Sequence, residues 1–164
     1  MPVNAPSSHL TEATKMVADA AIDLFECRLK TTPATIVYFY DGPQITWQSK
    51  TFEQVAVKLE GDKRAAEGAE SRPTLTVVNP LGVFNQFAFD GVFDYATLIR
   101  YRVLKSDLDN NINVFQRRMW YVSRVQQVLA NQGLVLELRN MSEGANFMVP
   151  VRMYMPPEFP FVTL

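Results

Sequence analysis

One segment near the middle of the chain, TLIRYRVLK, alternates between apolar and basic side chains over residues 99–103. Ile99, Tyr101 and Val103 fall on one face of this segment, and Arg100 and Arg102 fall on the other. A period of two residues is typical of a β-strand with one buried face, whereas a helix would repeat every three to four residues. Segments of similar composition recur along most of the chain, so strands rather than helices dominate the expected fold.

The predicted strands follow one another without the strand–helix–strand rhythm of a parallel α/β fold. We therefore expect a mainly β fold, an antiparallel sandwich or a partly open barrel. One or two short helices accompany it, the first over residues 10–20. The predicted strands cover residues 22–29, 35–41, 44–47, 51–60, 74–78, 97–105, 115–128, 134–138 and 147–155.

Two segments leave alternatives open. The strand over residues 35–41 is apolar on both faces, so it is either sandwiched between two layers or covered by a neighbouring subunit. Asn79-Pro80 favours the start of a second helix, with a phenylalanine-rich stretch following at helical spacing. The alternative is a loop whose phenylalanines pack against the sheet. Both alternatives place the aromatic stripe in the core rather than in a ligand site.

The 164 residues are expected to form a single domain with three peripheral segments. Residues 1–9 form a flexible arm. Residues 61–72 (GDKRAAEGAESR) have no large apolar side chain, so they form an exposed loop that is either simply solvated or orders against a partner. Residues 155–164 form a proline-rich tail that cannot join a central strand and exposes Phe159 and Phe161 unless something covers them.

The composition argues against catalysis and against bound metals. The chain has one histidine, His9, and one cysteine, Cys27, which the pattern places in a strand as a small buried hydrophobic residue. Neither a nucleophile pair nor a zinc or iron–sulfur ligand set can be assembled from them, and no catalytic or metal site and no cofactor is expected. A net charge of −1 argues against nucleic-acid binding, and no apolar stretch is long enough for a membrane anchor.

The candidate functional positions are basic or aromatic. Arg100 and Arg102 form a basic cluster with Arg117 and Arg118 of the next strand. This cluster is either a surface that meets an acidic partner or a solvated sheet face. The predicted partner-interface residues are Lys63, Arg64, Arg72, Arg100, Arg102, Phe159 and Phe161.

Several blocks of the sequence resemble the N-terminal portion of the minor tail protein L family of lambda-like long-tailed phages. The most specific block is Ser71-Arg72-Pro73-Thr74-Leu75-Thr76-Val77-Val78-Asn79, which resembles a strand motif of that family. The segment QITW at residues 44–47 followed by Lys50-Thr51-Phe52, and the segments 98–105, 119–122 and 147–155 with Pro150 and Arg152, resemble further blocks in the same order.

The resemblance covers residues 20–155 and implies a structural role in the virion tail tip. It implies a β fold of the tail-tube or hub type and a homo-oligomeric, trimeric adapter ring assembled in the host cytoplasm. The expected partners are the distal tail-tube ring protein and the central tail tip protein. The chain lacks the family's cysteine-rich C-terminal domain, since Cys27 is its one cysteine, so no metal function carries over. The alternatives are a tail-completion or head–tail joining protein and, less favoured, an enzyme acting on the cell wall.

Overall fold

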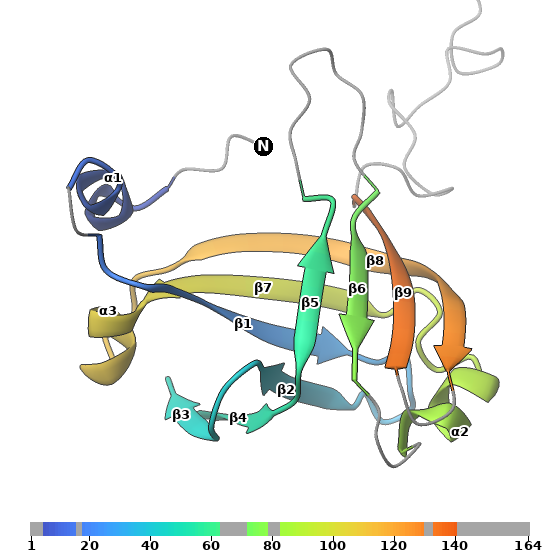
Figure 1. Ribbon diagram of the computed structural model, residues 1–164. Helices are drawn as coiled ribbons and strands as arrows, with labels where there is room; N and C mark the ends of the chain where they lie inside the picture. Colours follow the sequence, from blue (N-terminus) through green and yellow to red (C-terminus); the bar gives the residue numbers. More distant parts are fainter. Residues whose placement is uncertain (1–4, 16–17, 63–71, 79–82, 130–132, 141–164) are drawn as a thin grey trace, which may run out of the picture.

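The fold was obtained as a computed structural model, which describes residues 5–15, 18–62, 72–78, 83–129 and 133–140. Of these residues, 50% lie in strands and 16% in helices, so the prediction of a mainly β fold is confirmed (Figure 1). The predicted strand over residues 147–155 lies outside the described residues.

The described strands form one nine-stranded sheet in the order β3-β4-β2-β1-β7-β8-β9-β6-β5. Most of them start and end within two residues of the predicted positions, because alternating apolar side chains mark them clearly. The strands are β1 (Ala21–Arg28), β2 (Ile36–Tyr40), β3 (Ile45–Trp47), β4 (Lys50–Gln54), β5 (Val57–Glu60), β6 (Thr74–Val77), β7 (Thr97–Leu104), β8 (Gln116–Leu129) and β9 (Gly133–Asn140).

All neighbouring strands are antiparallel except β2 and β4, which are parallel. Phe39 lies opposite Glu53, and Tyr40 lies opposite Gln54. The predicted, predominantly antiparallel pairing thus holds for seven of the eight neighbouring pairs, and β2–β4 is the exception. After β2 the chain forms the β3–β4 hairpin, and it is the returning strand β4, not β3, that lies beside β2, so β2 and β4 run in the same direction.

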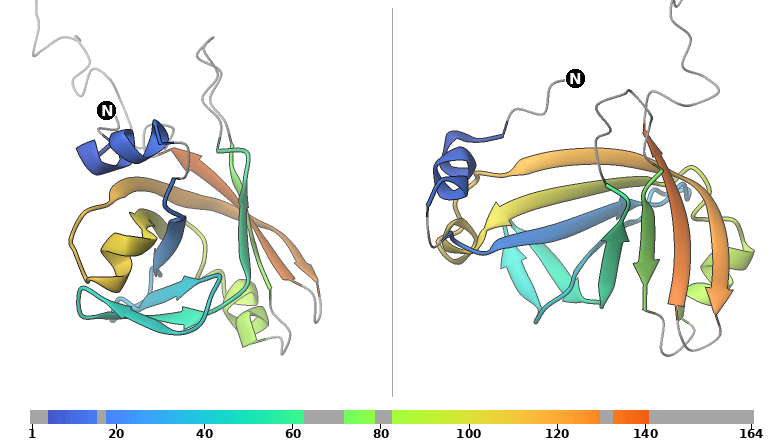
Figure 2. Two further views of the ribbon diagram at one scale, coloured as in Figure 1. Left: turned by 60° about the vertical axis from the view of Figure 1, so that its left-hand side comes forward. Right: turned by 45° about the horizontal axis from the view of Figure 1, so that its top comes forward.

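The sheet curls into an open barrel, and one continuous stretch of chain joins its two end regions (Figure 2). The sequence predicts a single strand over residues 51–60, but the structure divides it at Val55 and Ala56 into β4 and β5. The Val55 N–H donates to the Tyr40 carbonyl at 3.0 Å, and the Val78 N–H donates to the Ala56 carbonyl at 2.9 Å. This stretch therefore changes partners from β2 to β6, while β4 and β5 themselves are not hydrogen-bonded neighbours.

The barrel interior is the larger of two hydrophobic cores. Inward-facing residues of β1, β2 and β5 to β9 meet there, together with apolar residues of the helical segment after β6. Phe25 and Phe39 lie opposite each other on the adjacent strands β1 and β2, and their rings stack with 5.7 Å between the centroids. The buried members of this inner core are Phe25, Cys27, Leu29, Phe39, Leu75, Val77, Phe93, Ala96, Leu98, Trp120, Val122, Leu134, Leu136 and Leu138.

A second core lies on the opposite face of β1, β2 and β7, beneath the β3–β4 hairpin. Trp47 of the hairpin is buried there against Tyr101 and Phe115, and its Nε1–H donates to the Ile112 carbonyl at 3.2 Å. The apolar strand over residues 35–41 thus lies between two layers of its own chain, which decides between the two alternatives left open by the sequence. The buried members of this outer core are Leu24, Tyr40, Trp47, Phe52, Ile99, Tyr101, Val103 and Leu108.

Three short helices occur in the described part of the chain, one more than expected: α1 (Ser7–Ala13), α2 (Val83–Phe89) and α3 (Lys105–Asp109). The predicted helix over residues 10–20 is wrong in position, since residues 18–20 are not helical and residues 7–9 of the predicted arm are. The expected apolar face of α1 is also not buried, with Leu10 61% exposed. The helix alternative for the stretch after Asn79-Pro80 is confirmed, whereas α3 occupies a segment expected to be a turn. No helix in the described residues has the length and apolar character needed to cross a membrane.

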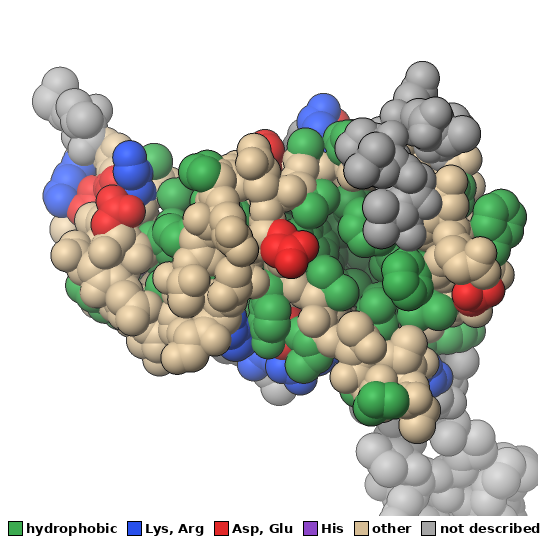
Figure 3. Space-filling model, turned by 90° about the horizontal axis from the view of Figure 1, so that it is seen from below, with side chains coloured by type: hydrophobic (Ala, Val, Ile, Leu, Met, Phe, Trp, Pro, Cys, Tyr) green, Lys and Arg blue, Asp and Glu red, His purple; other side chains and the backbone are tan. Residues whose placement is uncertain are grey.

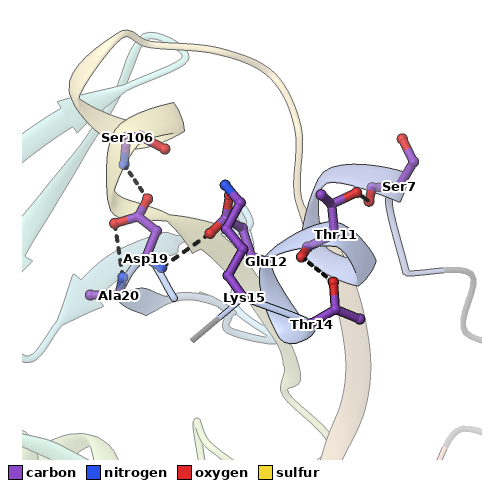
Figure 4. A network of polar contacts seen from close by, with 8 residues as sticks. All are labelled: Ser7, Thr11, Glu12, Thr14, Lys15, Asp19, Ala20 and Ser106. Atoms are coloured by element: carbon purple, nitrogen blue, oxygen red, sulfur yellow. Dashed lines mark hydrogen bonds and ion pairs between the residues drawn. The ribbon is translucent and has the colours of Figure 1, made fainter. Parts of the chain in front are cut away.

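Asp19 connects the N-terminal segment to the start of α3 (Figure 4). Its carboxylate accepts hydrogen bonds from the backbone N–H groups of Ser106 at 2.9 Å and Ala20 at 2.8 Å, and its own N–H donates to Glu12 at 3.2 Å. The hydrogen bond from Ser106 is the main reason why the pKa of Asp19 is lowered. Because α3 lacks a side-chain cap of its own, Asp19 satisfies one of the donors at its first turn.

Candidate functional site

An open cleft of about 620 Å³ lies at one end of the barrel and carries most of the buried charge of the inner face. Strands β1, β7 and β8 form its charged wall, and β5 and the end of β2 form the wall opposite. The charged wall results from the curl of the sheet, which turns the arginine face of β7 inward instead of toward solvent. The residues that line the cleft include Asp23, Phe25, Asp41, Val57, Leu59, Asp62, Arg100, Arg102 and Arg118.

Two aspartates pair with three arginines along the charged wall. Arg102 forms a bidentate pair with Asp23, with Nε–Oδ1 and Nη2–Oδ2 distances of 2.8 and 2.9 Å. Asp62 bridges the other two arginines, with Oδ2 at 2.9 Å from Nη1 of Arg100 and Oδ1 in contact with Arg118. Arg100 and Arg118 are directly opposite each other on β7 and β8, so Asp62 screens a repulsive cross-strand pair.

Arg100 is the most deeply buried of these cations, with 4% of its surface exposed. Its guanidinium lies 5.5 Å from the centre of the Trp120 ring, within cation–π distance. Burial lowers the pKa of Arg100, and the nearby charges of Asp23 and Asp62 oppose that change. Its Nε lies 3.9 Å from Asp23, too far for a hydrogen bond, and has no hydrogen-bond partner among the described residues.

A second, smaller cavity of about 110 Å³ opens on another face of the barrel and is almost entirely apolar. Side chains from β1, β2, β6 and β9 line it, with Phe84 and Phe87 of α2 at one side. Figure 3 shows apolar side chains gathered around a hollow on the lower face of the molecule. Cys27 also lines this cavity, and burial raises the pKa of its thiol to about 12.

Large apolar side chains near α2 remain exposed. Phe89 is 82% exposed and Phe87 is 41% exposed, and Tyr95 in the following turn is 66% exposed. Tyr95 also has a left-handed backbone, with φ of 60°, which is uncommon for a bulky residue. This α2 patch, defined as Phe87, Phe89 and Tyr95, comprises the exposed large aromatic side chains of α2 and of the turn that follows it.

The structure brings together two of the predicted interface residues, Arg100 and Arg102, and leaves Arg72 exposed just before β6. Lys63, Arg64, Phe159 and Phe161 lie outside the described residues. Arg100 and Arg102 do not form an open basic surface, since aspartates pair with both of them inside the cleft.

The sequence analysis missed Asp23 and Asp62 as partners of the arginines. Asp23 could have been found, since it shares the alternation of Phe25 and Cys27 and therefore had to face inward with them. Asp62 could not, because its partners lie 38 and 56 positions further along the chain in a different part of the sheet.

The chemistry available in the cleft is electrostatic. Guanidinium groups bind carboxylates and phosphates through parallel hydrogen bonds and hold their charge at any physiological pH. No group of three or more His, Cys, Asp or Glu side chains within the described ranges is placed to hold a metal ion. The fold and the site thus define an open β-barrel with a charged cleft and a separate apolar patch.

Comparison with known proteins does not identify a family for this chain. The chain matches no protein-family model, and no curated protein matches it.

Proposed function

We propose that the chain is a structural component of the tail tip of a long-tailed phage. In this role it forms a homo-oligomeric, trimeric ring that joins the distal tail-tube ring to the central tail tip protein, and it is assembled in the host cytoplasm. The proposal draws on the sequence blocks that resemble the minor tail protein L family. The mainly β open barrel agrees with the tail-tube or hub fold expected from that resemblance.

The observation that carries the assembly role is the α2 patch. Exposed rings such as Phe89 are costly in water, and aromatic side chains are enriched at protein–protein interfaces. A neighbouring copy in a ring would cover the patch at every subunit, because each copy presents the same surface. The strand over residues 35–41 no longer supports this role, since its two apolar faces are covered within the chain.

The test compares the oligomeric state of the purified chain with that of Phe87→Ser and Phe89→Ser variants by light scattering and negative-stain electron microscopy. We expect rings for the unmodified chain and a shift toward monomers for both variants. Leu10→Ser is the matched control, because it removes from α1 an apolar side chain whose exposed fraction lies between those of Phe87 and Phe89, and it should leave the rings intact.

The proposal would be contradicted if the purified chain were monomeric at all concentrations and did not co-purify with co-expressed phage tail proteins. Rings that persist unchanged in both phenylalanine variants would contradict the assignment of the α2 patch as the interface.

A further inference from the structure

The charged wall of the cleft has an excess of positive charge. Three guanidinium groups, those of Arg100, Arg102 and Arg118, face two carboxylates, those of Asp23 and Asp62. Asp41 also lines the cleft, but it is exposed to solvent and forms no ion pair with the described residues. Buried and half-buried charges are stable when they are paired, and within the described part of the chain one cation of the wall has no matching anion.

Two hydrogen-bond donors in the same place are also unused. The Nε–H groups of Arg100 and Arg118 are buried, and neither has an acceptor among the described residues. Both arginines contact Asp62 through Nη1, and the Nε–H group of each guanidinium takes no part in that contact. Buried polar groups nearly always have a partner in stable proteins, so the wall has fewer acceptors than donors among the described residues.

The opposite wall of the cleft is apolar. Val57 and Leu59 of β5 face the charged wall, and Phe25 lies at its base. A volume of about 620 Å³ lies within the range of about 300–1,000 Å³ typical of ligand sites and exceeds what a single small anion fills. The cleft therefore suits a ligand that combines a carboxylate with a neighbouring apolar group.

From these features we infer that the cleft binds an acidic segment of a partner protein. A glutamate or aspartate side chain of that segment accepts a hydrogen bond from the partly exposed guanidinium of Arg118 and is attracted by the buried charge of Arg100, and an adjacent apolar side chain packs on Val57 and Leu59. Arg102 supports the site by holding Asp23. The inference does not depend on the tail-tip role, since it follows from the charges and donors of the isolated chain.

The experiment measures binding of a short capped peptide with adjacent leucine and glutamate residues to the full chain, by calorimetry at physiological ionic strength. We expect saturable binding that weakens about tenfold or more in Arg118→Gln, which removes one charge-assisted hydrogen bond to the peptide. We expect a similar loss in Arg102→Gln, because this change leaves Asp23 without the partner that holds it in place. Replacing the peptide glutamate with glutamine should have the same effect. Arg117→Gln is the matched control, because Arg117 is exposed on the other face of β8 and should change the affinity by less than about twofold.

Thermal unfolding of each variant verifies folding, and the two arginine variants give independent answers if one of them is unstable. Inorganic phosphate that competes as strongly as the peptide would show a general anion site and overturn the assignment to an acidic segment. Absence of saturable binding, or equal weakening by Arg117→Gln, would overturn the inference altogether. Ring formation is measured separately, so failure here leaves the test of the assembly role unaffected.

Discussion

Glu26 is a charged residue at a position where both chain neighbours, Phe25 and Cys27, are buried. Only 1% of its surface is exposed. Its carboxylate accepts hydrogen bonds from Arg28 at 2.6 Å, Lys50 at 2.8 Å and the Tyr101 hydroxyl at 2.9 Å. Three donors from β1, β4 and β7 thus converge on one buried group and tie the β3–β4 hairpin to the sheet.

Replacing this carboxylate should destabilise the fold. Glu26→Gln keeps the shape of the side chain but leaves the Lys50 ammonium without its charge partner, so we expect a loss of about 1–3 kcal/mol in the free energy of unfolding. Glu53→Gln, at an exposed position of β4, is the control and should change stability by less than about 0.5 kcal/mol. Chemical denaturation measures both variants, and equal stabilities would contradict the structural role of Glu26.

The contribution of Glu26 should depend on pH. Burial alone would raise the pKa of Glu26, but the hydrogen bonds from Lys50, Arg28 and Tyr101 outweigh burial and lower it. Because the pKa is lower in the folded state, the unfolded chain binds more protons in acid, and stability is lost as the pH falls below the ordinary value of about 4.3. We expect the stability difference between the wild type and Glu26→Gln to shrink over that range, as followed by denaturation at a series of pH values. A difference that grows in acid would contradict this sign.

Cys27 should be unreactive in the folded protein. Its side chain is 3% exposed and its pKa is raised to about 12, so the reactive thiolate is scarce at about pH 8. A chromogenic disulfide reagent should therefore label Cys27 only after unfolding in guanidinium chloride. Rapid labelling without denaturant would show that the inner core opens readily at this strand.

The turn of the β3–β4 hairpin requires a left-handed backbone that its two residues disfavour. Gln48 and Ser49 have φ values of 50° and 62°, as in a two-residue type I′ turn, where glycine or asparagine is favoured. Asn111 compensates, since its side-chain oxygen accepts a hydrogen bond from the Gln48 N–H at 2.9 Å. The turn is thus held partly by the segment that follows α3.

Ser49→Gly should stabilise the hairpin. Glycine removes the cost of a left-handed backbone, and after its larger entropy loss on folding the net gain should be up to about 1 kcal/mol. Ser49→Ala keeps the steric cost and is the control. Urea denaturation midpoints compare the three proteins, and a lower midpoint for the glycine variant would show that the serine side chain has another role.

The elements that the sequence predicts well are those that local patterns determine. Strands such as β7 and β8 follow from alternating side chains, and the order of the β7–β8–β9 meander follows from short connections. The face of a strand that turns inward depends on the curl of the whole sheet. For this reason Arg100 was expected on a surface but is buried, and Glu137 was expected to face outward but is 4% exposed, hydrogen-bonded to Arg124 and Gln126.

Both hydrophobic cores that the structure describes are built from the barrel strands, the β3–β4 hairpin and the helical segments. The buried residues of both cores lie between Leu24 and Leu138. The tail, with Phe159 and Phe161, follows them in the sequence.

Truncation after Met155 should leave the monomer fold intact but weaken ring or tail assembly. We expect the Tm to change by less than about 4 °C, which corresponds to about 1 kcal/mol or less for a chain of this size. The full-length Phe159→Ser/Phe161→Ser variant is the matched control for chain length and should show the same loss of assembly. If the truncated chain unfolds as a monomer, the tail belongs to the core and its interface role is wrong.

The three strands β1, β2 and β7 each have one face in the inner core and the other in the outer core. Loss of either core would expose one face of these three strands to solvent. The strands would then no longer be held in place to form the other core. Neither core can therefore unfold independently of the other, although the two cores are spatially separate. Unfolding should be a single cooperative transition, with calorimetric and van't Hoff enthalpies that agree. Thermodynamically, the two cores are one folding unit.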